Sequence, residues 1–248
     1  MKMPGTWNRM AQAGRRSEPR SRPDGRSAGA TSRAGTDAGR RLSLAGLAVA
    51  CVLLVGGCAL LGGGSRESTA IYAPDPRITL DPSLPSVPWQ LTISPADAAR
   101  MIDSLRIVVQ PTPGELQVYK GARWSKSPTQ MLEDAVLRGL EDSGKIAAVA
   151  RQGSGIDGDY KLVMDLRRFE ADYAGAAVPA ATIEVNAKLL HPIDQKVVAS
   201  RTFLVKKPAS STAIADVAAA FDPALGEMAR QLAAWVLTSG DGNERGTH

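Results

Sequence analysis

The chain is poor in the residues that build metal centres and disulfides. It has 248 residues but only two cysteines and two histidines. Cys51 lies in an apolar run seven residues before Cys58, and His248 is the terminal residue, so Cys58 and His191 remain for the folded part. These numbers exclude a Cys/His zinc site. Two cysteines so close together in one leader do not indicate a structural disulfide. We expect no metal and no cofactor.

Sequence signatures of common enzyme classes are also missing. The chain has no G-x-x-x-x-G-K-[ST] phosphate-binding loop, and no G-x-S-x-G nucleophile motif follows Cys58. His191 precedes Pro192 between two expected strands, which favours a solvated turn residue over a catalytic base. The carboxylate pairs at 141–142 and 157–159 fall at a helix end and in a loop, where caps explain them better than acid–base catalysis. We therefore expect no enzymatic activity.

Positive charge is concentrated in the N-terminal segment. Ten Lys and Arg against three Asp and Glu precede Cys58, giving this segment a net charge of +7. From Cys58 onward, twenty Lys and Arg face twenty-two Asp and Glu, a net charge of −2. The basic isoelectric point thus belongs to a leader and does not indicate nucleic-acid binding.

Residues 1–57 are expected to be a leader that ends in a lipoprotein signal peptide. Arg40-Arg41 precede Leu42–Val55, fourteen residues without a charge. This run is too short to span a membrane and fits a secretory hydrophobic region. Val55-Gly56-Gly57-Cys58 follows and resembles a bacterial lipobox, with cleavage between Gly57 and Cys58. A plain signal peptide, in which Cys58 has no role, is the alternative.

A lipobox implies that Cys58 becomes the first residue of the mature protein and carries covalent lipid. Several acyl chains hold a protein to a bilayer far more firmly than one, at ~0.8 kcal/mol for each buried methylene. Ala59 follows the cysteine, and by resemblance to enterobacterial sorting this favours the periplasmic side of the outer membrane over the inner membrane. The roughly forty residues before Arg40 fit a disordered tail, a start codon placed too early, or a partial twin-arginine leader.

The mature chain divides into a tether, one domain and a tail. Residues 58–88 contain a Gly-Gly-Gly run and then five prolines, which is typical of a linker. Tyr72 could instead dock on the domain. We expect the domain at 89–238 and a disordered tail at 239–248.

Period-two and period-four patterns predict the elements of the domain. Ser94-Pro95 predicts a helix to about residue 104, and Ser127-Pro128 predicts another that ends near Gly144. Short strands are expected at 91–93, 105–110, 116–119 and 146–150. Longer alternating strands are expected at 160–167, 183–189 and 197–205, as an antiparallel meander covered on one side.

The last expected element is a long amphipathic helix. Ile214, Val217, Phe221, Leu225, Met228, Leu232 and Trp235 form one apolar stripe. This stripe favours packing on the sheet, and Asp222-Pro223 predicts a kink or a restart. The fold class is therefore α+β: a single mixed, largely antiparallel sheet with helices packed on one face.

A series of short motifs occurs in order along the domain: Pro111, Tyr119, Arg123-Trp124, Ser143-Gly144, Asp159–Leu162, Arg168-Phe169 and Trp235. With these motifs the chain, most clearly at residues 105–149, resembles the ABC-type transport auxiliary lipoprotein (PqiC/YmbA-like) family. The resemblance covers roughly residues 70–238. It implies a periplasm-facing, non-catalytic lipoprotein that works with the MCE-domain protein, permease and ATPase of a lipid transporter. An outer-membrane assembly or envelope-structural lipoprotein is the alternative.

The segment from Tyr119 to Ser127 is the candidate contact site. Tyr119, Arg123 and Trp124 are expected in a loop at the sheet edge, and Trp and Arg are favoured at interface hot spots. This predicts a contact with an MCE protein or with a second copy of the chain. The alternative is that Trp124 plugs the edge of the core while Arg123 binds a carbonyl.

Overall fold

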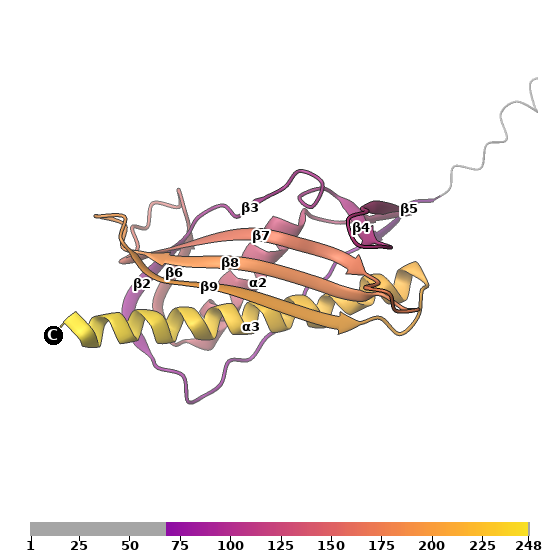
Figure 1. Cartoon of the computed structure of the whole chain (residues 1–248). Helices are drawn as coiled ribbons and strands as arrows, with labels where there is room; N and C mark the ends of the chain where they lie inside the picture. The colour runs from indigo at the N-terminus through magenta and orange to yellow at the C-terminus, as the bar shows by residue number, and fades with distance from the viewer. Residues whose placement is uncertain (1–67, 248) are drawn as a thin grey trace, which may run out of the picture. The chain divides into compact units, whose positions relative to one another are not determined.

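The computed structural model describes residues 68–247. In this part of the chain, nine strands form one sheet, accompanied by two helices (Figure 1). The elements in chain order are β1 (Ala70–Tyr72), β2 (Val87–Ile93), β3 (Asp97–Ala98), β4 (Arg106–Gln110), β5 (Gln117–Trp124), α2 (Pro128–Ser143), β6 (Ile146–Arg151), β7 (Tyr160–Asp172), β8 (Ala180–Leu190), β9 (Val197–Pro208) and α3 (Ile214–Thr247).

The three longest strands form the predicted antiparallel meander. β7 pairs with β8 from Lys161↔Leu190 to Asp172↔Ala180, and β8 pairs with β9 along nearly its whole length. On its other edge β7 pairs in parallel with β2, β3 and β4, so the sheet is mixed as expected. The path then runs outward through β5 to β1 on one side and through β6 on the other.

Both helices contribute to one core on the inner face of the sheet. Alternate residues of β7 and β8 are fully buried there, and the apolar stripe of α3 packs against them, which confirms the α+β prediction. Phe221 of α3 lies 4.8 Å from Phe169 and 5.0 Å from Trp124 between ring centroids. α3 is continuous through Pro223, so the helix does not restart at that residue.

α2 begins and ends where the sequence predicted. The backbone N–H of Ser127 donates to Gln130 Oε1 at 3.4 Å, and Gly144 ends the helix with a left-handed φ of 61°. A further cap comes from a distant turn, because Asp103 Oδ1 accepts from the Thr129 hydroxyl at 2.7 Å. Glycine suits the left-handed position since it has no Cβ to clash.

The helix predicted from Ser94 to about residue 104 is wrong. The Ser94 N–H donates to Leu162 O of the sheet, and the Ala96 N–H donates to Glu133 Oε1 of α2. The first N–H groups of a helix are free for such bonds, so it is the pairing of Asp97 and Ala98 with β7 that keeps this backbone extended and excludes the helix. The segment forms only the two-residue β3 and a turn at residues 99–104.

The predicted boundaries of tether and tail also need correction. β1 pairs with β5, and the Ser125 N–H donates to Tyr72 O, so the chain joins the domain by Ala70 rather than at 89. Residues 73–86, which we call the strap, follow the helices: Asp75 forms an ion pair with Arg138, and Leu80 is buried. At the other end, α3 continues to Thr247, where a disordered tail from 239 was expected.

Candidate functional site

The predicted attachment and cleavage residues, Cys58 and Gly57, lie outside the described residues. The described chain begins at Ser68, ten residues after Cys58. The anchor therefore stays a prediction.

The predicted contact segment is a strand rather than a loop. Trp124 ends β5 and is 1% exposed, with its ring edge-on to Phe169 and to Phe221. A side chain so buried cannot contact a partner, so its proposed role in binding is wrong and the alternative role in the core is correct. The end of β5 is not at the sheet edge either, because β1 pairs with residues 122–124.

Arg123 and Tyr119 lie differently from Trp124. Arg123 is exposed and stands directly opposite Arg106 of β4 and beside Ile71 of β1. Tyr119 is half-buried, and burial, together with the neighbouring Tyr173, raises its pKa to about 12. Of the three predicted residues, only Arg123 offers a charged group to a partner.

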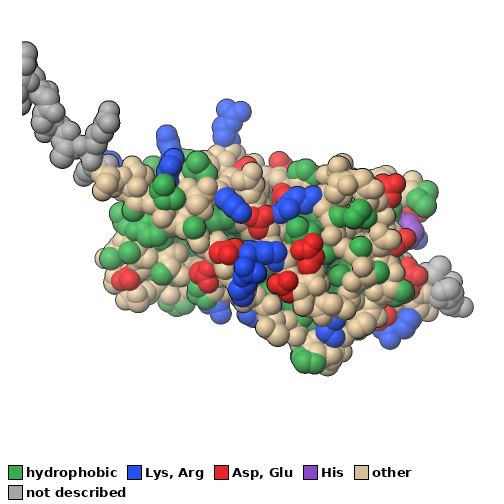
Figure 2. Space-filling view, turned by 180° about the vertical axis from the view of Figure 1, so that it is seen from behind, with side chains coloured by type: hydrophobic (Ala, Val, Ile, Leu, Met, Phe, Trp, Pro, Cys, Tyr) green, Lys and Arg blue, Asp and Glu red, His purple; other side chains and the backbone are tan. Residues whose placement is uncertain are grey.

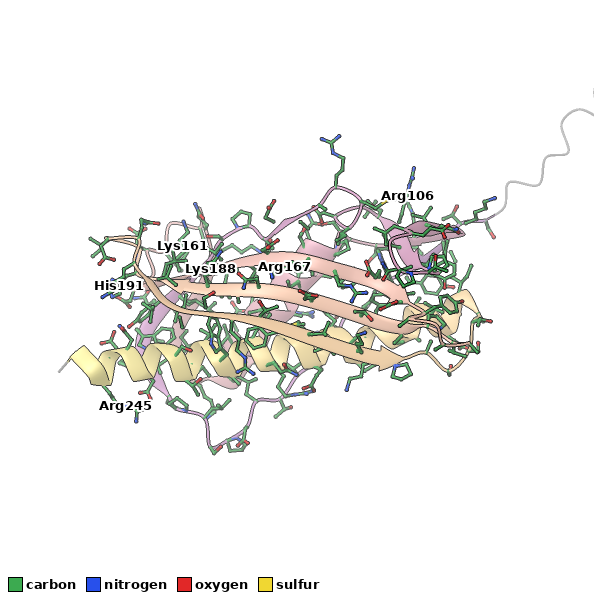
Figure 3. All side chains as sticks on the ribbon, viewed as in Figure 1. Arg106, Lys161, Arg167, Lys188, His191 and Arg245 are labelled. Carbon is green, nitrogen blue, oxygen red and sulfur yellow. The ribbon has the colours of Figure 1, made fainter. Side chains whose placement is uncertain are left out.

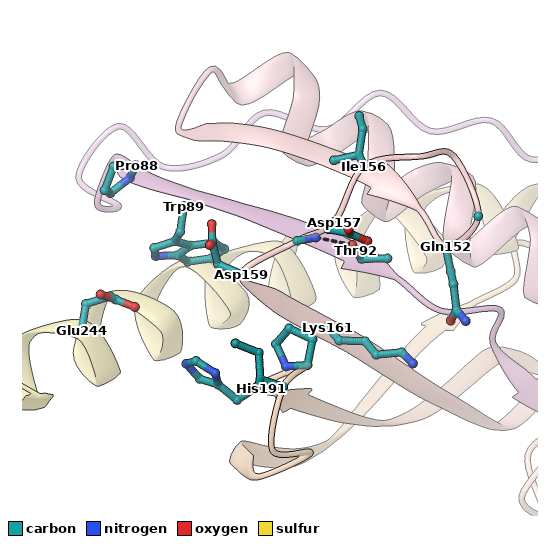
Figure 4. A pocket seen from close by; sticks show the side chains of 14 residues that line it. Pro88, Trp89, Thr92, Gln152, Ile156, Asp157, Asp159, Lys161, His191 and Glu244 are labelled. Atoms are coloured by element: carbon teal, nitrogen blue, oxygen red, sulfur yellow. Dashed lines mark hydrogen bonds between the residues drawn. The ribbon is translucent and has the colours of Figure 1, made fainter.

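A cavity of about 710 Å³ opens at the opposite end of the meander (Figure 4). Its walls come from β2, the loop between β6 and β7, the turn after β8 and the end of α3. The charged side chains around it are those of Asp157, Asp159, Lys161 and Glu244, and its apolar wall includes Trp89 and Ile193. The cavity thus combines carboxylates with an apolar face.

A cluster of edge-on aromatic rings lies beside this cavity. Tyr160 lies 4.9 Å from Trp89 and 5.4 Å from His191 between ring centroids, both edge-on. The Tyr160 hydroxyl donates to Glu244 Oε1 at 2.7 Å. Burial, and then this bond to a carboxylate, raises the pKa of Tyr160 to about 12, so the phenol stays protonated and ties α3 to the sheet.

Several polar groups of the cavity hold backbone in place. Asp159 Oδ2 accepts from the Gln90 N–H at 2.8 Å, and Thr92 Oγ1 accepts from the Gly158 N–H at 3.0 Å. Sequence reasoning assigned residues 157–159 to an exposed loop and His191 to a solvated turn. It did not bring them together, because the register that sets Leu190 opposite Lys161 leaves no mark in the sequence. His191 is half-buried.

A second charged cluster lies on α2 and its neighbours. Asp134 pairs with Lys126 and with Arg151, and Arg138 pairs with Asp75 of the strap. Acidic and basic side chains are interspersed on the face seen from behind (Figure 2). Because the charges of this cluster are matched within the chain, it offers little net charge to a partner.

The described part of the chain holds neither a metal-ligand cluster nor a membrane-spanning helix. Among residues 68–247, no three His, Cys, Asp or Glu side chains are grouped as metal ligands would be. In the same range, no helix is both long and apolar enough to cross a bilayer.

Comparison with known proteins decides the family. Residues 70–233 match the family model described as the ABC-type transport auxiliary lipoprotein component. The chain belongs to this family. The crystal structure of protein XCC0632 from Xanthomonas campestris, a similar structure, is 58% identical, with a TM-score of 0.69, and the match covers 71% of this chain and 99% of that one.

Two more distant matches were found, one to a solved structure and one to a sequence. A second solved protein is 13% identical with a TM-score of 0.51, covering 65% of this chain and 99% of that one, and shows likeness of fold alone. Protein bll6063 of Bradyrhizobium diazoefficiens is 24% identical over 178 residues, which are 72% of this chain. The match spans about half (47%) of that curated relative's length.

Proposed function

We propose that the protein is a non-catalytic lipoprotein that serves an MCE-type ABC transporter moving lipids between the inner and outer membranes. Lipid on Cys58 holds it on the periplasmic side of the outer membrane. The observation that carries the proposal is the family match over residues 70–233, which begins twelve residues after the lipobox-like Cys58.

An auxiliary component acts through surfaces rather than through chemistry of its own. The ATPase and permease of such a system are separate chains, and the MCE-domain protein is the partner we propose for this one. Self-association of the chain is a further part of the proposal. The match to a transport family favours this function over that of an envelope-structural lipoprotein.

The anchor is tested by the mass of the protein purified from membranes. We expect the N-terminus at Cys58 with a mass increase equal to a diacylglyceryl group and an acyl chain. Cys58→Ala should leave an uncleaved, unlipidated precursor. An unmodified Cys58 in membrane-purified protein would refute the anchor.

The transport role is tested by following labelled phospholipid between the two membranes of living cells. Cells that lack the chain should exchange lipid more slowly, and cells with Cys58→Ala should behave like them. Unchanged exchange in cells that lack the chain would remove the proposed role in lipid transport.

A further inference from the structure

The outer face of β4 and β5 carries two arginines without counter-ions. Arg106 and Arg123 are direct partners in this antiparallel pair, so their side chains project from the same face. Both are exposed, and neither makes an ion pair within the described residues. Like charges directly opposite each other destabilise a sheet. The arrangement therefore costs stability unless an anion approaches from outside.

Exposed apolar side chains lie beside Arg123 and in the segment that leads into β4. Ile71 of β1 is aligned with Arg123 and is 55% exposed. Leu105, which precedes β4, is 41% exposed, and Met101 in the turn before it is 42% exposed. We call Ile71, Met101, Leu105, Arg106 and Arg123 the arginine face.

The carboxylates in the segments before and after β4 are hydrogen-bonded to other side chains. Asp103 accepts from the Thr129 hydroxyl, and Glu115 accepts from Thr112 and from Gln117. Both carboxylates keep their charge, but within the described residues neither forms an ion pair with Arg106 or Arg123, so both guanidinium groups are open to an approaching anion.

The anchor places this face close to a membrane. Ser68 comes ten positions after Cys58, and a fully extended chain spans at most ~3.3–3.6 Å per residue, so this link reaches no further than ~35 Å. Because β1 and the strap are bound to the domain, residues 70–88 do not lengthen the link. The arginine face includes Ile71 of β1, which is the first described element after Cys58.

We propose that the arginine face lies against the membrane that holds the anchor, with Arg106 and Arg123 on anionic phospholipid headgroups and Ile71, Met101 and Leu105 at the interface. This inference rests on the proposed lipidation of Cys58. A basic patch supplies a second membrane signal beside an acyl anchor. The cavity beside Trp89 then lies at the end of the domain far from this contact, since the turn at His191 is at the other end from Arg106 (Figure 3).

The test uses the lipidated protein in liposomes with a spin label at residue 71. Acylation of Cys58 leaves Ile71→Cys as the free thiol, and the mass of the protein confirms that acylation first. In liposomes with anionic lipid, we expect the label to be shielded from a water-soluble nickel relaxation agent. In purely zwitterionic liposomes it should be exposed. A label at Ile193→Cys, a position 90% exposed beyond the far end of the meander, should be exposed in both.

Charge variants show whether binding depends on the two arginines or on the overall positive charge of the domain. Each basic residue near an anionic surface contributes about fivefold, so Arg106→Ala with Arg123→Ala should weaken contact about thirtyfold and expose the label. Lys188→Ala with Lys196→Ala removes two positive charges toward the His191 end of the domain, and this variant should leave the label at residue 71 shielded. High salt should act like the arginine variant, because it screens exposed charges.

Three outcomes overturn the proposal. A label at residue 71 that is equally exposed in both kinds of liposome would show that the face does not touch lipid. Shielding that appears only after a transporter protein is added would assign the face to a protein contact. A free Cys58 in the mass measurement would remove the anchor, and with it both this inference and the anchored form of the proposed function.

Discussion

Trp124 shows how the role of a residue depends on the strand that carries it. The sequence places Tyr119, Arg123 and Trp124 within six positions, and their types suit an interface. Which of them faces outward depends on where β5 starts and on which strands flank it. The pairing of Arg123 with Arg106 and Ile71 is a long-range property that local patterns do not show. The sequence shows that these side chains suit an interface, but it does not show which of them points outward from β5.

Truncation of Trp124 tests its assignment to the core. Trp124→Ala should lower the free energy of unfolding by ~3–5 kcal/mol, because it leaves a cavity against Phe169 and Phe221. Arg123→Ala, a change at an exposed site, should stay within about 0.5 kcal/mol. Urea denaturation of both variants measures this. Similar stabilities for the two would contradict the assignment.

Asp172 gives the domain a dependence on acid pH. Burial alone would raise its pKa, but hydrogen bonds from Arg168 at 2.8 Å and from the Ala174 N–H at 2.9 Å hold the pKa below its usual 3.8. Since the pKa is lower in the folded state, this stabilisation is complete above about pH 3.8 and disappears as pH falls through the folded value.

Asp172→Asn should therefore lose about 3 kcal/mol of stability at pH 7, because Arg168 keeps only Glu170 as an ion-pair partner. The variant should also lose less stability than the wild type between pH 5 and pH 2. Unfolding curves across this range measure both effects. Parallel pH profiles for the two proteins would show that Asp172 does not contribute.

At the scale of elements, periodic hydrophobic patterns predicted the long strands and α3 correctly, whereas local capping signals predicted one helix correctly and one wrongly. The meander and the apolar stripe of α3 were predicted because buried and exposed positions alternate regularly. The Ser94-Pro95 signal failed because Asp97 and Ala98 pair with β7 of the sheet, which holds the backbone extended where the helix was predicted. The last turns of α3 were missed because residues 239–247 carry no apolar stripe. They are held by contacts with β2 and β7.

Two glycines near the end of α3 test this contact. Ala normally stabilises a helix relative to Gly by up to ~1 kcal/mol, and Gly242→Ala should do so, since an added methyl there meets nothing within 4 Å. Gly240→Ala should instead destabilise, because its methyl would overlap the rigid indole of Trp89, with Cε2 at 2.9 Å. Thermal unfolding compares the two. Equal gains in both variants would mean that α3 does not pack on Trp89 at this point.

At the scale of the molecule, the sequence predicted the class but not the boundaries. The prolines of residues 58–88 suggested a linker, yet a proline-rich segment can also pack against a helix where the helix presents small residues. Gly139 and Gly226 leave that room for Ile78 and Pro76 of the strap. This packing depends on the strap and on the helices together, so it could not be predicted from the sequence of either segment alone.

We expect the strap and both helices to unfold together. The protein in detergent should show one cooperative transition for the described domain, unchanged by a metal chelator or by a reductant. Calorimetry with and without each reagent checks this. A separate early transition for the strap, or a shift of the midpoint on chelation, would contradict it.

The most direct measurement of the central claim is affinity purification from detergent-solubilised envelopes, with the chain tagged at its C-terminus. We predict that the MCE-domain protein and the permease and ATPase of one ABC transporter co-purify with it, in larger amounts than with the Cys58→Ala variant. Recovery of outer-membrane assembly proteins in place of a transporter, or recovery of the same transporter in equal amount with Cys58→Ala, would contradict the role of an anchored transport auxiliary.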